Sequence, residues 1–534
     1  MPTAPPSLLD ISITELGALL SNGAINSHVL VELFSQRVRE VNDELKAVIE
    51  INPDAFRIAN DLDAERANGT VRGPLHGIPI VVKDNYATRD GMLTGSGSVC
   101  LAQARPSEDA TAVAKLRDAG AIILAKANLD EFSGGRAVQR NGWSSRGGQT
   151  FGAYVKYQTA CGSSSGSGVA ASLGLAAGTL GTETAGSITC PAMYNNVVGI
   201  KPTVGLTSRF GTVPVSFVQD TVGPIAQSVE NAAIILDAIA GKDPNDNYTS
   251  AQPWDTPPSF TAALDPSALR GARIGVVWLN EDFINASNFQ NIDYIRPVFD
   301  RALADLETAG AELVNVELEI GGLNKEDFVR WVKGNNSIHI TAEFKESLTR
   351  YVEEFTEPDR TAMRNVSELL ECLRTDSREL ADKYNLGPFE EVFHYNKTVG
   401  SYEVWEAYIT ASTMTHNMIL GPLREHQLDA LVMLPEIALA IGAVPGLPIV
   451  TVPMGVIGPD AKLIWDKEHI EIVTGPSIPL GLSFIADRWS DRDLIGYGYA
   501  YEQMSKRRRE LDPVVKPVSD LDLVLKRYSL GDEL

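Results

Sequence analysis

Residues 161–170 read CGSSSGSGVA, and the overlapping stretch SGVAASLGLAAG extends to Gly178. The second stretch is rich in small residues, which favours a tightly packed helix over a flexible serine linker. A loop of this kind can cradle a phosphate, but the P-loop pattern GxxxxGK[ST] requires a lysine that is missing here. The dinucleotide pattern GxGxxG is also missing. The loop therefore serves a purpose other than nucleotide binding.

Short apolar runs and helical patterns alternate on both sides of this loop. Before it come GIPIVVK at 77–83, DATAVAKLRDAG at 109–120 and AIILAKA at 121–127. After it come SVENAAIILDAIAG at 228–241 and ARIGVVWL at 272–279. Strand–helix alternation is typical of α/β proteins. We therefore predict an α/β fold with a central mixed, mostly parallel β-sheet that helices cover on both faces.

The pattern also divides the chain into parts. Residues 1–70 are predicted to form an N-terminal helical arm, residues 71–510 one α/β domain, and residues 511–534 a C-terminal tail. Within the domain, residues 285–425 are richer in charged and aromatic side chains, and we expect a mainly helical insertion that covers one side of the sheet. No polar linker between residues 70 and 510 is long enough to separate a further domain.

One uncharged stretch, Ile437–Gly458, is 22 residues long and could cross a bilayer. It contains three prolines, and its segment LPIVTVP is short, β-branched and bounded by proline and glycine. Such a segment fits a buried strand better than a membrane helix. We therefore expect protein core here and no integral membrane segment.

Charge, the N-terminal sequence and the cysteines indicate where the protein is located and which partners it can bind. A formal net charge of −23 would repel phosphate backbones, so we expect no nucleic-acid partner. The N-terminus lacks a basic stretch followed by a clean apolar run, so no signal peptide is expected and the predicted location is cytoplasmic. The four cysteines lie far apart without CxxC spacing and are predicted to be reduced thiols or core residues of an intracellular protein: Cys100, Cys161, Cys190 and Cys372.

Nucleophilic chemistry remains as a use for the serine loop, and a serine nucleophile needs a base. The seven histidines show no G-x-S-x-G or other triad context. Lys83, at the end of GIPIVVK, can be that base if burial brings its pKa near neutrality. A second Ser/Gly cluster, GTETAGSITCPA at 181–192, forms a tight turn before Ser187. Backbone N–H groups of this turn could converge on one oxygen, as an oxyanion hole requires.

These residues, taken in order, match a known family. Lys83, Ser163 in GSSSGSG and Ser187 in TETAGS, with the two serines 24 positions apart, resemble the amidase signature family. Flanking segments agree: GPLHGIPIVVKDN, NNVVGIKPTVGLTSRFG, DTVGPIAQSVENAAIILDAIAG, GLPIVTVPMG and IPLGLSFIADRWSDRDLIGYGYAYEQ. The resemblance runs from about Ile25 to Arg509 and is weakest across the insertion.

The resemblance implies a Ser–cis-Ser–Lys triad. Ser187 would be the nucleophile, Ser163 the bridging serine on a non-proline cis peptide, and Lys83 the base. The implied reaction is hydrolysis of a carboxamide C–N bond through an acyl-Ser187 intermediate, with release of ammonia or an amine. Neither a cofactor nor a metal is implied. The oxyanion hole would use backbone N–H groups of Thr184, Ala185, Gly186 and Ser187.

The sequence departs from the usual family pattern at three positions near Ser187. The family usually has Asp where Glu183 stands, Gly where Ala185 stands and Arg where Thr189 stands. Ala185 fits the turn only if its φ is negative. Since Glu183 and Thr189 together remove an Asp–Arg pair, we expect the nucleophile loop to be supported in a different way.

In the family, the segment before the bridging serine and the variable insertion wall the acyl pocket. Here that segment is about Phe132–Gln149, and Ser133 and Gly134 are the expected substrate contacts. Trp143 is either part of the pocket wall or packed in the core. Three arginines of this segment either attract a substrate carboxylate or are solvated: Arg136, Arg140 and Arg146.

Two other functions stay open at this point. The chain could be the glutaminase-like subunit of a tRNA-dependent amidotransferase, or a catalytically weakened binding protein of the same fold. The long helical insertion and the lack of a basic surface favour a free-standing hydrolase of a small-molecule amide, with a homodimer as a possible assembly. The sequence does not choose among small aliphatic, aryl and longer-chain amides.

Overall fold

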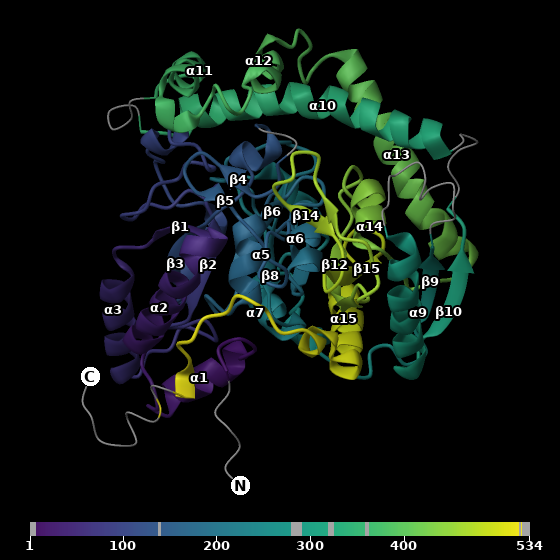
Figure 1. Ribbon diagram of the computed structural model, residues 1–534, viewed down its shortest axis with the longest axis horizontal. Helices are drawn as coiled ribbons and strands as arrows, with labels where there is room; N and C mark the ends of the chain where they lie inside the picture. Colours follow the sequence, from purple (N-terminus) through teal and green to yellow (C-terminus); the bar gives the residue numbers. More distant parts are fainter. Residues whose placement is uncertain are drawn as a thin grey trace.

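The computed structural model describes residues 7–136, 140–278, 291–318, 325–357, 363–522 and residue 525. The expected start of the insertion, near residue 285, and most of the predicted tail beyond residue 522 lie outside these residues. An eleven-stranded sheet runs through the molecule (Figure 1), with the strand order β1 (Val48–Ile51), β3 (Ile122–Ala127), β2 (Pro79–Lys83), β6 (Thr179–Glu183), β8 (Thr221–Ala226), β7 (Val198–Lys201), β12 (Ile449–Val456), β15 (Pro479–Ile485), β11 (Ala430–Met433), β9 (Arg273–Val277) and β10 (Glu312–Val316).

Antiparallel pairs occupy the centre of this sheet and its β1 edge, and parallel pairs lie on both sides of the centre. β2 is parallel to β3 and β6, and β9 is parallel to β11 and β10. The other six neighbouring pairs are antiparallel. The predicted mixed α/β sheet is confirmed, with antiparallel neighbours more frequent than parallel ones. Two short pairs lie outside it, β4 (Trp143–Ser144) with β5 (Gly148–Gln149) and β13 (Ile464–Trp465) with β14 (Ile472–Thr474).

Helices cover both faces of the sheet, as predicted. Successive side chains of a strand point to opposite faces, and β12 shows which helix lies on which. Val450 lies against Gly498 of α15 (Asp491–Ser505). Thr451 points to the other face, where it lies beside Gly481 of β15 and near Met193 of α6 (Thr189–Tyr194). α5 (Ser165–Ser172) packs beside α6, and α7 (Val229–Ile239) packs beside α15. The remaining helices of the N-terminal half are α1 (Ile13–Ser21), α2 (Ser27–Leu45), α3 (Ala55–Ala67) and α4 (Thr111–Asp118).

The uncharged stretch at 437–458 belongs to the core. It forms most of α14 (Pro435–Gly442) and the almost entirely buried strand β12. Its β-branched residues suit a sheet that is covered on both faces. Among the helices that the structure describes, none has the length and apolar character that crossing a membrane would require.

The insertion is helical in its later part. There it contains α10 (Lys325–Glu354), α11 (Val366–Thr375), α12 (Gly387–His394) and α13 (Tyr402–Glu425). Its earlier part contributes α9 (Ile292–Thr308) and the strand β10, which extends the sheet beside β9. In Figure 1, α10 crosses above one end of the strands. Helix α10 therefore covers an end of the sheet, whereas α9 packs against β12, β15 and β10 beside α15, on one of its faces.

The cysteines form two disulfides, Cys100–Cys372 and Cys161–Cys190. The prediction of reduced thiols is wrong, because spacing along the chain says nothing about neighbours in the fold. The partners are 272 and 29 positions apart, yet each pair has a Cα–Cα distance of 5.9 Å. Disulfides persist in oxidising compartments, so these pairs weigh against a reducing location.

The disulfides give a direct chemical prediction. Protein unfolded in denaturant without reductant should expose no reactive thiol, whereas prior reduction should release all four cysteine thiols of the chain. Thiol titration of both samples checks this. Four thiols in the unreduced sample would contradict the pairing.

Candidate active site

Strand β2 delivers Lys83 into the interior. Lys83 is the last residue of the strand, and its side chain is fully buried. Its Nζ lies 2.7 Å from Ser163 Oγ, 3.0 Å from Thr182 Oγ1 and 3.4 Å from the Thr182 carbonyl oxygen. Thr182 lies on β6, the parallel neighbour of β2. The structure thus brings together two residues that the sequence selected, and it adds Thr182 as a third.

Burial changes the protonation of Lys83. It lowers the pKa of this lysine to about 7, and the carboxylates of Asp130, Asp220 and Glu183 limit the fall. A neutral amine has two N–H donors and one lone pair. The two Thr182 oxygens can accept from the donors, which leaves the lone pair for the Ser163 hydroxyl. Near neutral pH, a substantial fraction of Lys83 is therefore able to act as a base.

The Ser163 loop packs against Asp130. The Gly162–Ser163 peptide bond is cis, as the resemblance implies. A Cβ at Gly162 would lie 2.1 Å from an Asp130 carboxylate oxygen, so only glycine fits there. The Asp130 N–H also donates to the Ser163 carbonyl oxygen at 3.1 Å. Burial raises the pKa of the Asp130 carboxyl to about 6.

Two further serines of CGSSSGSGVA hold the loop to strand β6. Ser164 Oγ donates to the Thr182 carbonyl oxygen at 3.2 Å, and Ser167 Oγ donates to the Leu180 carbonyl oxygen at 3.0 Å. The buried Ser165 Oγ has no hydrogen-bond partner among the described residues. The Ser164 and Ser167 hydroxyls therefore have a structural role.

Ser187 lies between β6 and α6, and 9% of its surface is exposed. Its carbonyl oxygen accepts a hydrogen bond of 3.2 Å from the Ser164 N–H, so the loops that carry the two predicted catalytic serines touch. Gly186 has a φ of +85°, in the region that favours glycine, whereas Ala185 does not have a positive φ. The prediction for Ala185 is confirmed.

Glu183 supports the Ser187 loop in place of an Asp–Arg pair. Its buried carboxylate accepts hydrogen bonds from the N–H groups of Gly186 at 2.8 Å, Ile188 at 2.7 Å and Thr189 at 2.9 Å. Free N–H groups at the start of a helix favour a carboxylate. The longer side chain of Glu183 therefore holds the loop through three backbone N–H groups, with Thr189 Oγ1 as a further donor at 3.5 Å, and Thr189 needs no positive charge.

Not all of the backbone N–H groups predicted to form the oxyanion hole are free to bind an oxyanion. The Gly186 N–H is bonded to Glu183, and Thr184 Oγ1 donates to Asp220 at 2.6 Å. Within the described part of the chain, the N–H groups of Ala185 and Ser187 donate no hydrogen bond. The candidate oxyanion hole thus loses Gly186 and keeps Thr184, Ala185 and Ser187, because the bond from Thr184 to Asp220 uses its hydroxyl and not its backbone N–H.

Ser133 lies close to this centre. It lines a cavity of about 10 Å³ together with Asn85, Thr182 and Thr184. In the residues that the structure describes, the buried Ser133 Oγ and Asn85 Oδ1 have no hydrogen-bond partner. Gly134, the other expected substrate contact, borders open space, since a Cβ there would meet no atom within 4 Å.

The three arginines of residues 132–149 already form ion pairs with carboxylates of the protein. Arg136 is buried between Glu131 and Glu379, and Glu379 comes from the insertion. The other two are also paired with carboxylates, Arg140 with Glu468 and Arg146 with Asp84 and Glu50. Trp143 packs on Tyr384 with ring centroids 3.7 Å apart, so it is a core residue.

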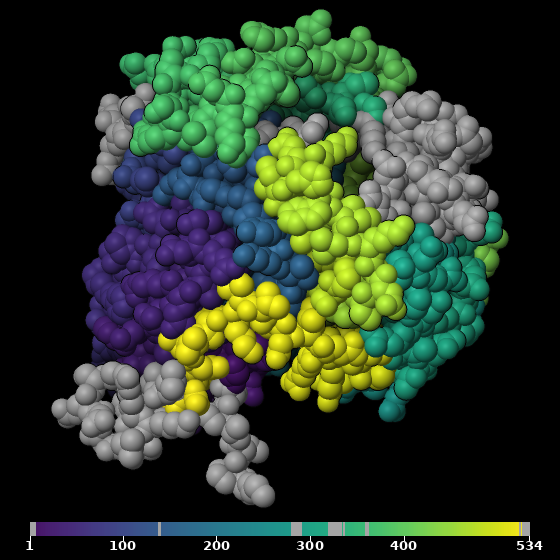
Figure 2. Space-filling view, in the orientation of Figure 1, coloured from purple at the N-terminus to yellow at the C-terminus, as the bar shows by residue number. Residues whose placement is uncertain are grey.

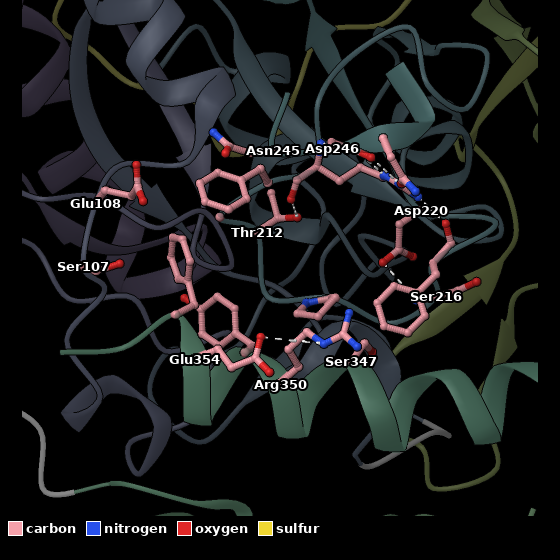
Figure 3. Close-up of a pocket in the computed structure, with 18 residues that line it drawn as sticks. Ser107, Glu108, Thr212, Ser216, Asp220, Asn245, Asp246, Ser347, Arg350 and Glu354 are labelled. Carbon is pink, nitrogen blue, oxygen red and sulfur yellow. Dashed lines mark hydrogen bonds and ion pairs between the residues drawn. The ribbon is translucent and has the colours of Figure 1, made fainter. Parts of the chain in front are cut away.

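A pocket of about 430 Å³ opens beside the centre. In Figure 3, Ser347, Arg350 and Glu354 rise from α10 toward the segment that carries Thr212, Ser216 and Asp220. Thr212 and Asp220 also line the small cavity beside Thr184. The pocket therefore shares a wall with the neighbourhood of Lys83. The green residues of the later part of the insertion lie across the top of the molecule in the space-filling view (Figure 2).

Sequence reasoning missed the polar residues that surround Lys83. Asn85 follows strand β2, Asp130 follows strand β3, and Thr182 lies near the end of strand β6. These three strands are parallel neighbours. Since the carboxyl ends of parallel strands meet at one edge of a sheet, polar residues after each buried run were the available signal.

Known proteins agree with this geometry. The family model described as Amidase matches residues 29–495. The chain belongs to the amidase family. It is 41% identical over 506 residues to a putative amidase of Arthroderma benhamiae, an alignment that covers 93% of this chain and 82% of that protein.

Two other relatives of this amidase bear on its function. The solved native peptide amidase of Stenotrophomonas maltophilia has a TM-score of 0.82 and 37% identity, and the match covers 95% of this chain and 98% of that one. A component chain of the glutamyl-tRNA(Gln) amidotransferase of Prochlorococcus marinus is 30% identical over 517 residues, which cover 92% of this chain and 97% of that protein. The family resemblance inferred from the motifs is confirmed.

Glu183→Gln should weaken both the fold and the reaction. A glutamine keeps one acceptor oxygen and turns an NH₂ group toward N–H donors, so at least one buried donor loses its partner. Each such loss costs about 1–3 kcal/mol. We expect a fall of this size in the free energy of unfolding, measured by denaturant titration, and a lower kcat. Thr189→Ser, which keeps the backbone donor, is the control, and equal stability of both variants would contradict the role of Glu183.

Proposed function

We propose that this amidase cleaves a carboxamide C–N bond through an acyl intermediate on Ser187, with Lys83 as the base and Ser163 as the proton link. The observation that carries the proposal is the 2.7 Å contact between a fully buried lysine and Ser163. Family membership supplies the reaction class. The buried amine supplies a base near neutral pH without histidine.

Acylation begins when the neutral Lys83 amine accepts the Ser163 proton while Ser163 accepts the proton of Ser187. The Ser187 oxygen then forms a bond to the amide carbonyl carbon. When the tetrahedral intermediate collapses, the C–N bond breaks and the departing nitrogen takes the proton back from Lys83 through Ser163. Ammonia or an amine leaves, and an ester remains on Ser187.

The oxyanion of the intermediate would be bound by the N–H groups that remain candidates, those of Thr184, Ala185 and Ser187. Glu183 fixes the turn on which these groups lie, because it holds the N–H groups of Gly186 and Ile188. Donors fixed before the reaction stabilise the developing charge without reorganisation, and removing one typically costs about 3 kcal/mol.

Deacylation repeats these steps with water. Water loses a proton to Lys83 through Ser163 as its oxygen attacks the ester carbonyl carbon. The bond between the carbonyl carbon and the Ser187 oxygen then breaks, Ser187 regains its proton, and a carboxylic acid is released. The enzyme returns to its starting state with a neutral lysine.

The substrate class is proposed from a solved neighbour. Because a peptide amidase aligns with 95% of this chain, we propose a peptide carboxamide as the first substrate to test, beside small aliphatic and aryl amides. The alternative role, as one chain of an amidotransferase complex, predicts glutaminase activity that depends on partner proteins. Gel filtration of the lone protein with a glutamine assay separates the two functions and also tests the expected homodimer.

The expected cytoplasmic location stays a prediction, and the two disulfides oppose it. Fractionation of the source cells with thiol blocking at lysis tests location and redox state together.

A fluorophosphonate should label one residue, Ser187. Intact-mass and peptide mass spectrometry should show one adduct in the wild type, none in Ser187→Ala, and strongly slowed labelling in Lys83→Ala. A binding protein of the same fold would give no adduct. Labelling that neither substitution affects would contradict the assignment.

The pH dependence of the reaction should report Lys83. Since its pKa is lowered to about 7, kcat/KM should rise as pH increases through about 7 and then level off as the neutral amine becomes the main form. Initial rates from pH 5 to pH 9 measure this. A rate that falls as pH increases through 7 would contradict a neutral-lysine base.

A further inference from the structure

A disulfide joins the two loops that carry the proposed catalytic serines. Cys161 stands two residues before Ser163, and Cys190 stands three residues after Ser187. The two cysteines are bonded to each other. The covalent link therefore runs in parallel with the hydrogen bond between the Ser164 N–H and the Ser187 carbonyl oxygen, and it joins the loop before strand β6 to the loop after it.

Weaker contacts also connect these loops. The Ser164 N–H donates to the Ser187 carbonyl oxygen at 3.2 Å. At the end of α6, Asn195 Nδ2 donates to the Ala160 carbonyl oxygen at 2.9 Å and to the Pro191 carbonyl oxygen at 2.8 Å. These hydrogen bonds can keep the segments together without the disulfide, but each leaves room for small shifts that a covalent bond removes.

We propose that Cys161 and Cys190 are positioning residues of the amidase reaction, and that their disulfide sets the spacing between Ser163 and Ser187. The inference rests on the proposed function of these serines. Proton transfer along Ser187, Ser163 and Lys83 requires hydrogen-bond distances at both steps. A misplacement of about 1 Å can cost about 100-fold in rate, so the disulfide acts on kcat more than on substrate binding.

The same disulfide makes the activity sensitive to reductants. Cys161 is 8% exposed and Cys190 is half-buried, so the bond is not sealed in the core. A dithiol reductant would donate two electrons and two protons, break the S–S bond and leave two thiols, while the dithiol itself becomes a disulfide. Reoxidation restores the bond, and the loss of activity is therefore reversible.

The second disulfide is a built-in control. Cys100–Cys372 joins the chain before strand β3 to helix α11 of the insertion, and it packs in a separate apolar cluster with Leu101, Leu369 and Leu373. It holds the insertion, and neither of its cysteines is a sequence neighbour of Ser163 or Ser187. Removing it tests the general effect of losing a disulfide.

The test compares two double variants with the wild type, each below its own melting midpoint. In Cys161→Ser/Cys190→Ser, kcat and the rate of fluorophosphonate labelling at Ser187 should fall about 10- to 100-fold, with KM changed less than about threefold. In Cys100→Ser/Cys372→Ser, both rates should stay within about threefold of the wild type. In that control variant a dithiol should lower kcat about 10- to 100-fold, as the loss of the Cys161–Cys190 bond does, and reoxidation should restore it.

Two results would overturn the positioning role. One is an unchanged kcat and labelling rate in Cys161→Ser/Cys190→Ser. The other is an equal loss in both double variants that follows the fall in melting temperature, because the disulfide would then be only a general stabiliser. If the wild type neither hydrolyses amides nor is labelled at Ser187, the proposed function itself is wrong. If the wild type is active and Cys161→Ser/Cys190→Ser is equally active, only the positioning role is wrong.

Discussion

The burial of a lysine side chain is the constraint on which the rest of this site depends. In the described residues no carboxylate oxygen lies within ion-pair distance of Lys83 Nζ, whose hydrogen-bond neighbours are Ser163 and Thr182. A cation there would lose its hydration without a direct counter-ion, so the neutral amine is favoured. Histidine is not needed, because removal from water lowers the lysine pKa into the range that histidine reaches intrinsically.

The fold provides this environment at one edge of its sheet. Parallel strands β2, β3 and β6 end together, and they supply Lys83, the segment that leads to Asp130, and Thr182. Two loops then close over the lysine. Close packing of Asp130 on Gly162 fixes the first loop, and the carboxylate of Glu183 fixes the second. The disulfide between them makes one rigid unit of two segments that the sequence separates.

Much of this centre could be predicted from the sequence, because the motif residues lie in short contiguous segments. The family resemblance of these segments implied the pairing of Lys83 with Ser163 and the cis peptide. The requirement for a φ that is not positive at Ala185 follows from its side chain. The mixed α/β sheet follows from the alternation of apolar runs and helical patterns.

What sequence reasoning missed depends on contacts between distant segments. The cysteine pairs join positions that no spacing rule connects. Arg136 looks like an isolated loop residue in the sequence, yet its partner Glu379 lies 243 positions away in the insertion. The same is true of strand β10, which is hidden in a segment of helical composition and is identified only by its pairing with β9. A local sequence pattern predicts local structure, but it does not identify disulfide, ion-pair or strand partners that are distant in the sequence.

A titration of Lys83 itself tests the neutral-lysine mechanism most directly. Protein labelled with [ε-¹³C]lysine would be followed by NMR from pH 5 to pH 11, with Lys83→Arg to assign the signal. Because burial lowers the pKa of Lys83, its midpoint should lie near 7, well below that of a solvated lysine at about 10.4. A midpoint close to 10 would mean that the lysine is charged at neutral pH, and it would contradict a mechanism that begins with the neutral amine.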